Sequence, residues 1–162
     1  MLLQMEEGNR MDVAPLAQVT LFQGLSPAQL KKVASICEAE TVDAGSVIFR
    51  EGEPGQSMYL LVSGKVRISR RVPGMGEEAL AILDAGQYFG EMGVVEESVR
   101  SADAYAHETA TLWRIDRRQF DQLLFTDKDL AYAVLWTLVR TLSARLRETN
   151  EKMKAFFAMS QF

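Results

Sequence analysis

Three polar residues, Glu91, Arg100 and Ser101, stand in a stretch of sequence where a buried strand would carry Val or Ile. The guanidinium of Arg100 can pair with phosphate oxygens in a charge-assisted contact, about twice as strong as a neutral hydrogen bond. A carboxylate accepts hydrogen bonds and donates none, so Glu91 suits a hydroxyl donor and is repelled by a phosphate. Ser101 can donate its hydroxyl to a phosphate oxygen. These residue types are those required by a ligand with one anionic phosphate and a free hydroxyl.

The residues that position this set are expected to form short strands joined by turns. Between residues 40 and 115, nine of the 11 glycines separate short runs rich in Val, Ile, Tyr and Phe. A spacing of about 8 to 12 residues per strand and turn favours an antiparallel barrel or sandwich over a parallel sheet. The expected strands are residues 47–49, 58–62, 66–69, 80–83 and 109–115, with a hairpin tip at 73–78.

Helices are expected on both sides of the strand region. Ser26 and Pro27 are typical of an N-cap and a first helical position, so a helix is predicted over about 26–39. Residues 1–19 have no clear period and are interpreted as a loosely ordered extension with a short helix toward Val19. After Asp116 the chain has no Gly or Pro, which predicts helices over 117–125 and from 128 to the end.

The last predicted helix carries a stripe of mostly apolar residues that step by three or four positions. The stripe spans roughly five to six turns, which is more than one small barrel can cover. We therefore expect a homodimer through paired C-terminal helices, the alternative being that the stripe only packs on the strands. The stripe consists of Leu135, Leu138, Leu142, Leu146, Thr149, Met153 and Phe156.

The polar set also matches a known motif. The sequence FGE at 89–91 is followed, nine residues after the glutamate, by Arg-Ser-Ala at 100–102. This pattern resembles the phosphate-binding cassette of the cyclic-nucleotide-binding domain family, of the catabolite activator protein and protein kinase A regulatory subunit type. AGSVIFREGEPGQSMYLLVSGKVRI at 44–68 is similar to the family's strands with their turn glycines, and LFQGLSPAQL at 21–30 to its leading helix.

The resemblance implies an α+β fold: an antiparallel β-roll, or jelly-roll-like double-stranded barrel, flanked by an N-terminal helix and two C-terminal helices. The domain would cover residues 20–162, with the roll at about 40–116 and the C-terminal helices at about 117–160. It also implies that Arg100 binds the phosphate and Glu91 the ribose 2′-hydroxyl, with backbone amides from Gly90 to Gly93 aimed at the same anion. The implied ligand-binding residues of the cassette are Phe89, Gly90, Glu91, Met92, Arg100, Ser101 and Ala102.

The resemblance favours cyclic AMP over cyclic GMP. Family members that prefer cyclic GMP often carry Thr where this chain has Ser101. RLRETNEKM at 145–153 is similar to the helix of the catabolite activator protein that contacts adenine, which would place Thr149 and Asn150 at the base. The middle of the cassette departs from the family, because Gly93 stands where many members have Ala or Ser, and 96–99 replaces a frequent Gly-x-Pro.

Composition excludes several classes of function. With 48% hydrophobic and 25% charged residues, a net charge of −4 and a pI near 5.1, the chain fits a globular domain without a broad nucleic-acid-binding face. The one cysteine, Cys37, and the one histidine, His107, exclude an internal disulfide and a zinc cluster. The first residues lack a secretory signal, and no apolar run approaches a membrane span, so we expect a cytoplasmic protein. The sequence contains no nucleophile in a catalytic motif, no metal-ligand set and no Walker loop, so we expect neither an enzyme nor a cofactor.

Two functions are compatible with these observations. The first is a sensor whose C-terminal helix is repositioned by cyclic nucleotide binding. About a dozen residues follow Asn150, too few for a helix-turn-helix domain, so the output is expected to pass to another protein, a dimer rearrangement or a separate chain. The alternative is a ligand-independent dimerisation or scaffold domain with a vestigial pocket. A third hypothesis is that the chain is a regulatory fragment of a larger protein, and the initiating methionine argues against it.

Overall fold

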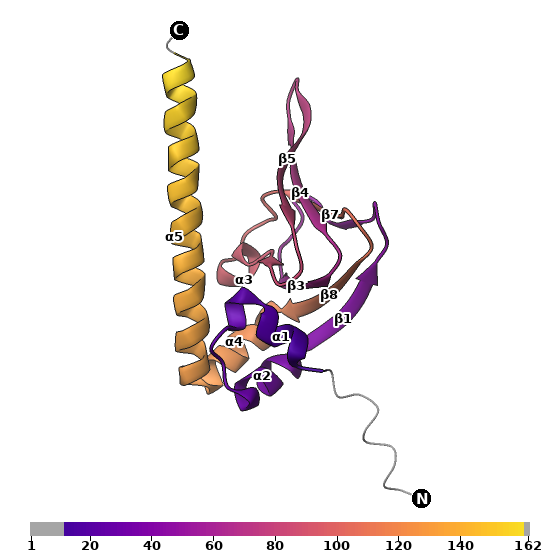
Figure 1. Cartoon of the computed structure of the whole chain (residues 1–162), viewed down its shortest axis with the longest axis vertical. Coiled ribbons are helices and arrows are strands. Elements are labelled where there is room, and N and C mark those ends of the chain that lie inside the picture. Colours follow the sequence, from indigo (N-terminus) through magenta and orange to yellow (C-terminus); the bar gives the residue numbers. More distant parts are fainter. Residues whose placement is uncertain (1–11, 161–162) are drawn as a thin grey trace, which may run out of the picture.

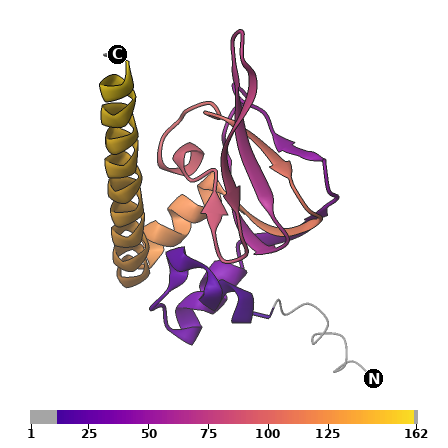
Figure 2. The same ribbon diagram turned by 45° about the horizontal axis from the view of Figure 1, so that its top comes forward.

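The computed structural model describes residues 12–160 and folds the strand region into two four-stranded antiparallel sheets (Figure 1). One sheet has the strand order β1-β8-β3-β6, and the other β2-β7-β4-β5. The sheets close into a roll, which confirms the predicted α+β class (Figure 2). The strands are β1 (Cys37–Val42), β2 (Val47–Phe49), β3 (Ser57–Ser63), β4 (Val66–Val72), β5 (Gly76–Leu83), β6 (Tyr88–Phe89), β7 (Asp103–Ala106) and β8 (Ala110–Asp116).

The roll separates two parts of the core. Successive side chains of a strand point to opposite faces, and β3 therefore sends Leu60 toward the helices and Leu61 between the sheets. β8 does the same with Trp113 and Leu112. β7 was not predicted because its sequence, DAYA, contains Asp and Ala, which are depleted from strands, and its pairing with β2 and β4 overrides that preference.

Helices pack on one side of the roll. They are α1 (Ala14–Gln18), the 3₁₀ turn η1 (Thr20–Phe22), α2 (Pro27–Ala34), α3 (Met92–Val95), α4 (Arg117–Thr126) and α5 (Lys128–Met159). The predicted start of α2 is confirmed by a capping box between Ser26 and Gln29. The predicted end at residue 39 is wrong, because Cys37 begins β1 and pairs with Ile115. Cys37 keeps a helical spacing from Val33 and is buried, so periodicity did not reveal the change to a strand.

The first described residues belong to the packed unit. Leu16 and Val19 are almost completely buried in the cluster beneath the helices, and α1 is the short helix expected toward Val19. The loosely ordered extension expected over 1–19 is therefore not what residues 13–19 form. Residues 1–11 lie outside the described part of the chain.

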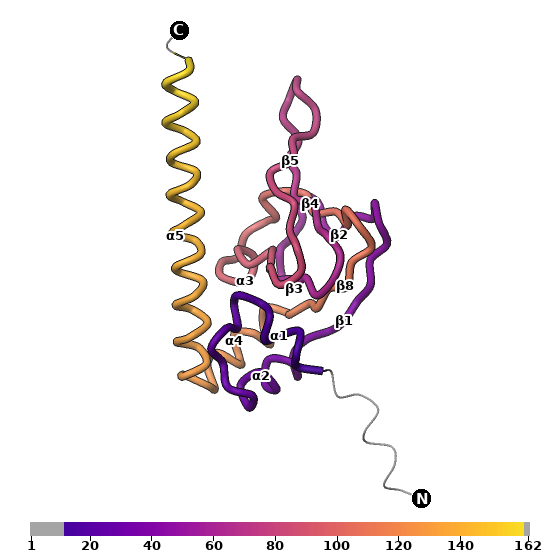
Figure 3. The backbone as a smooth tube through the Cα atoms, viewed as in Figure 1, coloured from indigo at the N-terminus to yellow at the C-terminus, as the bar shows by residue number. Residues whose placement is uncertain are grey.

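The C-terminal helices begin where the sequence predicts them. Asp116 accepts hydrogen bonds from the backbone amides of Arg118 and Gln119 at the start of α4, and Asp127 caps α5. At 32 residues, α5 is about 48 Å long. Its first third is anchored in the core, whereas residues 143–160 are exposed and run beside the projecting β4–β5 hairpin (Figure 3).

Candidate functional site

A cavity of about 370 Å³ lies between the roll, the segment 89–102 and α5. This volume is within the usual range of small-molecule sites, about 300–1,000 Å³. Its wall is apolar along β4 and β5 and polar near Glu91 and Arg100. The lining residues are Phe49, Ile68, Ala81, Leu83, Gln87, Phe89, Gly90, Glu91, Met92, Gly93, Val99, Arg100, Ser101, Ala102, Arg145 and Glu148.

Arg100 is a buried cation whose position is set by three contacts. Its Nη2 donates to the carbonyl oxygen of Ser57 at 2.7 Å, and its Nη1 donates to that of Gly90 at 3.1 Å. Its guanidinium carbon lies 4.2 Å from the ring centroid of Phe49. Burial lowers the pKa of Arg100, because removing water disfavours the charged form. Within the described structure its Nε has no hydrogen-bond partner, so the group keeps donor capacity for an anion.

Glu91 is also buried, with only 4% of its surface exposed. Its Oε1 accepts a hydrogen bond from Nη1 of Arg145, which reaches across from α5. A buried carboxylate is costly without such a partner. Because a carboxylate has several acceptor positions, Glu91 can also accept from a ligand hydroxyl.

Two glycines let the segment 89–102 fold tightly around Arg100. Gly90 has a φ of +74°, and a Cβ there would lie 2.7 Å from Nη1 of Arg100. Gly93 packs against the backbone of Gly55, where a Cβ would lie 2.7 Å from the carbonyl oxygen. The departure at Gly93 from the family pattern therefore has a structural reason: α3 lies directly on the loop that contains Gly55.

The departure at residues 96–99 is accommodated by the same loop. Val99 forms an isolated β-bridge with Pro54, and the amide of Arg100 donates to the carbonyl of Glu53 at 2.8 Å. Glu96 and Glu97 are exposed, and Glu97 pairs with Arg117 at 3.4 Å. These carboxylates are solvated, and they are not among the residues that line the cavity.

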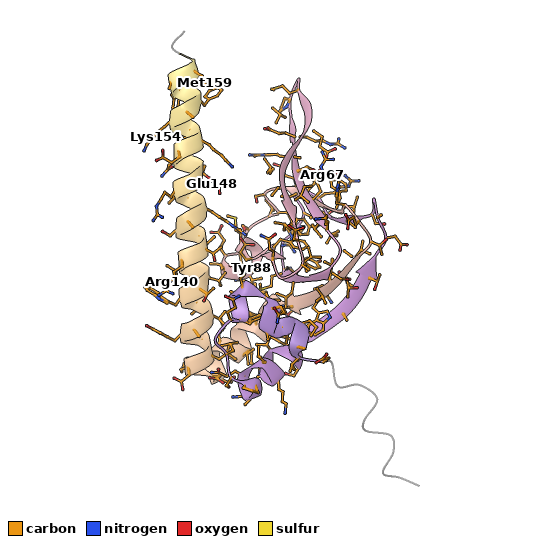
Figure 4. All side chains as sticks on the ribbon, viewed as in Figure 1. Arg67, Tyr88, Arg140, Glu148, Lys154 and Met159 are labelled. Atoms are coloured by element: carbon orange, nitrogen blue, oxygen red, sulfur yellow. The ribbon has the colours of Figure 1, made fainter. Side chains whose placement is uncertain are left out.

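Aromatic side chains pack around the polar end of the site. The rings of Tyr59 and Phe89 stack at 5.2 Å, and Phe49 lies 5.9 Å from each of them. Tyr88 lies between the roll and α5 (Figure 4), with the guanidinium of Arg145 at 6.0 Å from its ring. Burial raises the pKa of both Tyr59 and Tyr88. Of these aromatic side chains, Phe49 and Phe89 line the cavity, and Tyr59 packs against both of them.

The structure brings the predicted cassette residues together. Phe89, Gly90, Glu91, Met92, Arg100, Ser101 and Ala102 all line the cavity. Thr149 and Asn150 do not: both are exposed on α5, and the hydroxyl of Thr149 donates to the carbonyl of Arg145. Their contact with a base stays a prediction.

Sequence reasoning missed the residues that α5 places at the cavity. Arg145 and Glu148 line it, and Glu148 also pairs with Lys152 at 2.7 Å. Arg145 precedes Thr149 by one helical turn, so the similarity of the 145–153 segment to a nucleotide-contacting helix was the signal that could have found it. Phe49 was also missed, because its spacing is that of an ordinary strand residue.

Other site types have little support in the described part of the chain. Residues 12–160 contain no group of three or more His, Cys, Asp and Glu side chains arranged to hold a metal ion. Of the helices that the structure describes, none combines the length and the apolar character needed to cross a membrane.

Comparison with known proteins agrees with the geometry. The family model for the cyclic nucleotide-binding domain matches residues 39–127, more than half of the chain. This chain belongs to that family. The match spans the roll, α3 and α4, and includes every residue predicted for the cassette.

Individual members of the cyclic nucleotide-binding domain family are similar over most of this chain. The cyclic AMP receptor protein of Thermus thermophilus is 36% identical over 130 residues, covering 80% of this chain and 58% of that protein. The cGMP-dependent protein kinase 2 of Homo sapiens is 29% identical over 170 residues, covering 91% of this chain and 22% of the kinase. The crystal structure of the Thermus thermophilus catabolite activator protein superposes with a TM-score of 0.77 at 34% identity, covering 85% of this chain and 62% of that one.

The chain spans less than two thirds of the length of these relatives. The similarity therefore assigns a regulatory ligand-binding domain and its fold. The activities of the complete relatives belong to longer chains.

Proposed function

We propose that this chain is a cytoplasmic, non-catalytic sensor that binds a cyclic nucleotide, with cyclic AMP preferred over cyclic GMP. The observation that carries the proposal is the cavity in which Glu91 and Arg100 meet beside an apolar wall. A cyclic nucleotide needs a cation for its phosphate, an acceptor for its 2′-hydroxyl and an apolar surface for its base. Ser101 in place of Thr supports the preference for cyclic AMP.

We further propose that ligand occupancy changes the position of α5. Glu91 is the proposed acceptor for the ribose hydroxyl and is also the ion-pair partner of Arg145. A hydroxyl that approaches this carboxylate alters its interaction with Arg145, and α5 then shifts toward the arrangement that best fits the occupied cavity. The output passes to a second copy of the chain through α5 and to a protein partner that is not yet identified.

Thermal unfolding with added nucleotide tests the binding proposal. A ligand that binds only the folded state raises the melting temperature, so millimolar cyclic AMP should give the largest rise, cyclic GMP a smaller one and AMP none. No rise with any of the three would favour the alternative, a scaffold domain with a vestigial pocket.

The Arg100→Leu variant tests the role of the cassette. Truncating a buried charged contact costs about 2 to 5 kcal/mol, so its affinity for cyclic AMP should fall roughly 30-fold to several thousandfold in calorimetry. Arg117→Leu is the matched control, because Arg117 follows the roll and pairs with exposed Glu97. Circular dichroism establishes that each variant is folded. Equal affinities for the two variants would overturn the role of Arg100.

A further inference from the structure

The sheet β2-β7-β4-β5 has an outer face, on the reverse of the cavity wall, that carries a group of polar side chains. Ile68 lines the cavity, and side chains alternate along a strand, so Arg67 and Ser69 point outward from β4. Ser69 lies opposite Asp103 of β7 in the register of the ladder, which places Asp103 on the same face. Figure 4 shows Arg67 on the side of the roll away from α5. The outer face is thus separate from the site that we propose for the nucleotide.

The carboxylates of this outer face already have partners. Asp103 is buried, and its Oδ1 accepts a hydrogen bond from the backbone amide of Glu51 at 2.7 Å. Its Oδ2 accepts a hydrogen bond from the hydroxyl of Tyr105 at 3.1 Å. Two further carboxylates form ion pairs, Glu51 with Arg70 at 3.2 Å and Glu77 with Arg67 at 3.5 Å. The acceptors on this face are therefore in use.

Two arginines on the same face have no carboxylate partner. Among the described residues, neither Arg50 nor Arg71 forms an ion pair, and both side chains are exposed. Nη1 of Arg50 donates to the hydroxyl of Tyr105 at 3.3 Å, which holds this guanidinium beside the sheet. Together with Glu51 and Asp103, the two arginines line a surface depression of about 460 Å³. This depression therefore offers two cations whose charge is not yet compensated.

Two further polar atoms of this face are buried without a hydrogen-bond partner among the described residues. They are the hydroxyl oxygen of Ser69, a residue with no exposed surface, and the Nε of Arg67. Buried polar groups are normally paired, because an unpaired one loses its hydrogen bonds to water and gains none in return. Ser69 stands between Arg67 and Arg71 along β4, so three successive outward positions carry donors. The outer face has donors in excess and suits a ligand that brings acceptors.

We propose that these side chains bind the carboxylates of an acidic segment of a protein partner. The outer arginine site consists of Arg50, Arg67, Ser69 and Arg71. The planar fork of a guanidinium group matches a carboxylate, to which it can donate two parallel hydrogen bonds. The inference goes beyond the proposed nucleotide-binding function, because it assigns a second site and the chemistry of the partner that this site takes.

The charges around the outer arginine site favour a short acidic segment over a polyanion. Glu51 and Glu77 lie on the same face as the unpaired arginines and would repel a continuous row of phosphates. The whole chain carries a net charge of −4, which opposes binding to a nucleic acid or to an anionic membrane. Two unpaired guanidinium groups instead match one or two carboxylates.

A second depression beside the first indicates what accompanies the carboxylates. It has a volume of about 530 Å³, shares Arg71 with the first depression and extends to the tip of the β4–β5 hairpin. Val72 and Pro73 give this depression an apolar part. We therefore expect an extended segment, with its carboxylates at the arginines and an apolar side chain at Val72 and Pro73.

Fluorescence anisotropy of the full chain, without nucleotide, tests the outer arginine site. The probe is a labelled peptide of sequence GSEDEDLFSG, and the control peptide GSQNQNLFSG replaces its carboxylates by amides. The acidic peptide should bind about tenfold more tightly than the amide peptide. Arg50→Gln and Arg71→Gln should each weaken its binding about fivefold, and the double variant about 25-fold if the two contributions add. Arg118→Gln is the matched control, because Arg118 of α4 is exposed and also lacks an ion pair among the described residues.

Competition distinguishes the acidic segment from other anions. The competitors are a short DNA duplex, phosphatidylserine vesicles and inorganic phosphate, each at the same concentration of negative charge as the unlabelled acidic peptide. Each should displace the labelled peptide less well than the unlabelled peptide does, and stronger displacement by any of them would overturn the proposal. Equal affinities for the acidic and amide peptides, or equal weakening by Arg71→Gln and Arg118→Gln, would overturn it as well. The variants should melt at the wild-type temperature, so that a loss of peptide binding reflects the site and not the fold.

Discussion

Arg100 is held as a preorganised cation. The carbonyls of Ser57 and Gly90 and the ring of Phe49 fix its guanidinium before any ligand arrives. Rotamer freedom that is already lost does not oppose binding, so a fixed guanidinium binds an anion more tightly than a mobile one. A lysine could not reproduce this arrangement, because its point charge lacks the planar fork that donates to two carbonyls and keeps a further N–H for an anion.

At the residue scale, we predict that Phe49→Leu weakens cyclic AMP binding. The variant removes a desolvated cation–π contact of about 1 to 2 kcal/mol, so the dissociation constant should rise about 5-fold to 30-fold. Calorimetry on the folded variant measures this change. Phe49→Tyr retains the ring and should bind nearly as well as wild type. Equal weakening by both variants would show that Phe49 acts through packing alone.

The link between the cassette and α5 is one ion pair supported by aromatic packing. Glu91 precedes α3, and Arg145 lies 54 residues later on α5. The first third of α5 is anchored in the core by Leu130 and Val134, so a change at Arg145 acts on the exposed part of the helix. The part of α5 that we propose to transmit the signal therefore begins about where burial ends.

At the scale of elements, we predict that Arg145→Gln uncouples α5 from the cavity. In wild type, cyclic AMP should change hydrogen exchange both in residues 89–102 and in α5 beyond residue 140. In the variant, the cassette should still be protected by the ligand, while the change in α5 should largely disappear. Arg147→Gln, two residues away and exposed on the same helix, is the control. An unchanged response of α5 in Arg145→Gln would show that another contact carries the coupling.

Across the whole molecule, the helices and the roll share one of the two core clusters, and that cluster includes the only cysteine of the chain. Cys37 begins β1 and lies in the cluster beneath the helices. Its Sγ donates a hydrogen bond to the carbonyl oxygen of Val33 at 3.2 Å. Burial raises the pKa of Cys37 to about 12 from 9.0. Because the folded protein binds this proton more tightly than the unfolded chain, the resulting stability is complete below pH 9 and is lost as the pH rises toward 12.

We therefore predict that Cys37→Ala reduces the alkaline loss of stability. Between about pH 8.5 and about pH 10.5, the wild-type free energy of unfolding should lose about 2 kcal/mol more than that of the variant, at about 1.4 kcal/mol per pH unit above the unfolded pKa. Urea unfolding at the two pH values measures the difference. Tyr59 and Tyr88 are present in both proteins, and their contributions cancel. If wild type and variant differed in free energy of unfolding by the same amount at both pH values, the prediction would be contradicted.

Local features of the sequence predicted most of the fold. Glycine spacing indicated an antiparallel barrel or sandwich, and the family resemblance specified a roll. Ser26 and Asp116 marked helix starts, and the cassette pattern predicted a site within one short segment. The errors occurred where a local pattern had two outcomes. Cys37 fitted a helical period but begins a strand, and three of the four residues of β7 (DAYA) are Asp or Ala, which are depleted from strands.

The cassette is local in sequence, which is why Glu91, Arg100 and Ser101 could be placed without a structure. Its other wall is not local: Phe49 comes from β2, Arg145 and Glu148 come from α5, and only the packing of α5 against the roll decides which face of that helix reaches the cavity. The same packing leaves Asn150 exposed and outside the cavity lining. Helical periodicity shows that a face is apolar, whereas the tertiary structure determines whether that face is buried or free, because burial depends on contacts between distant segments.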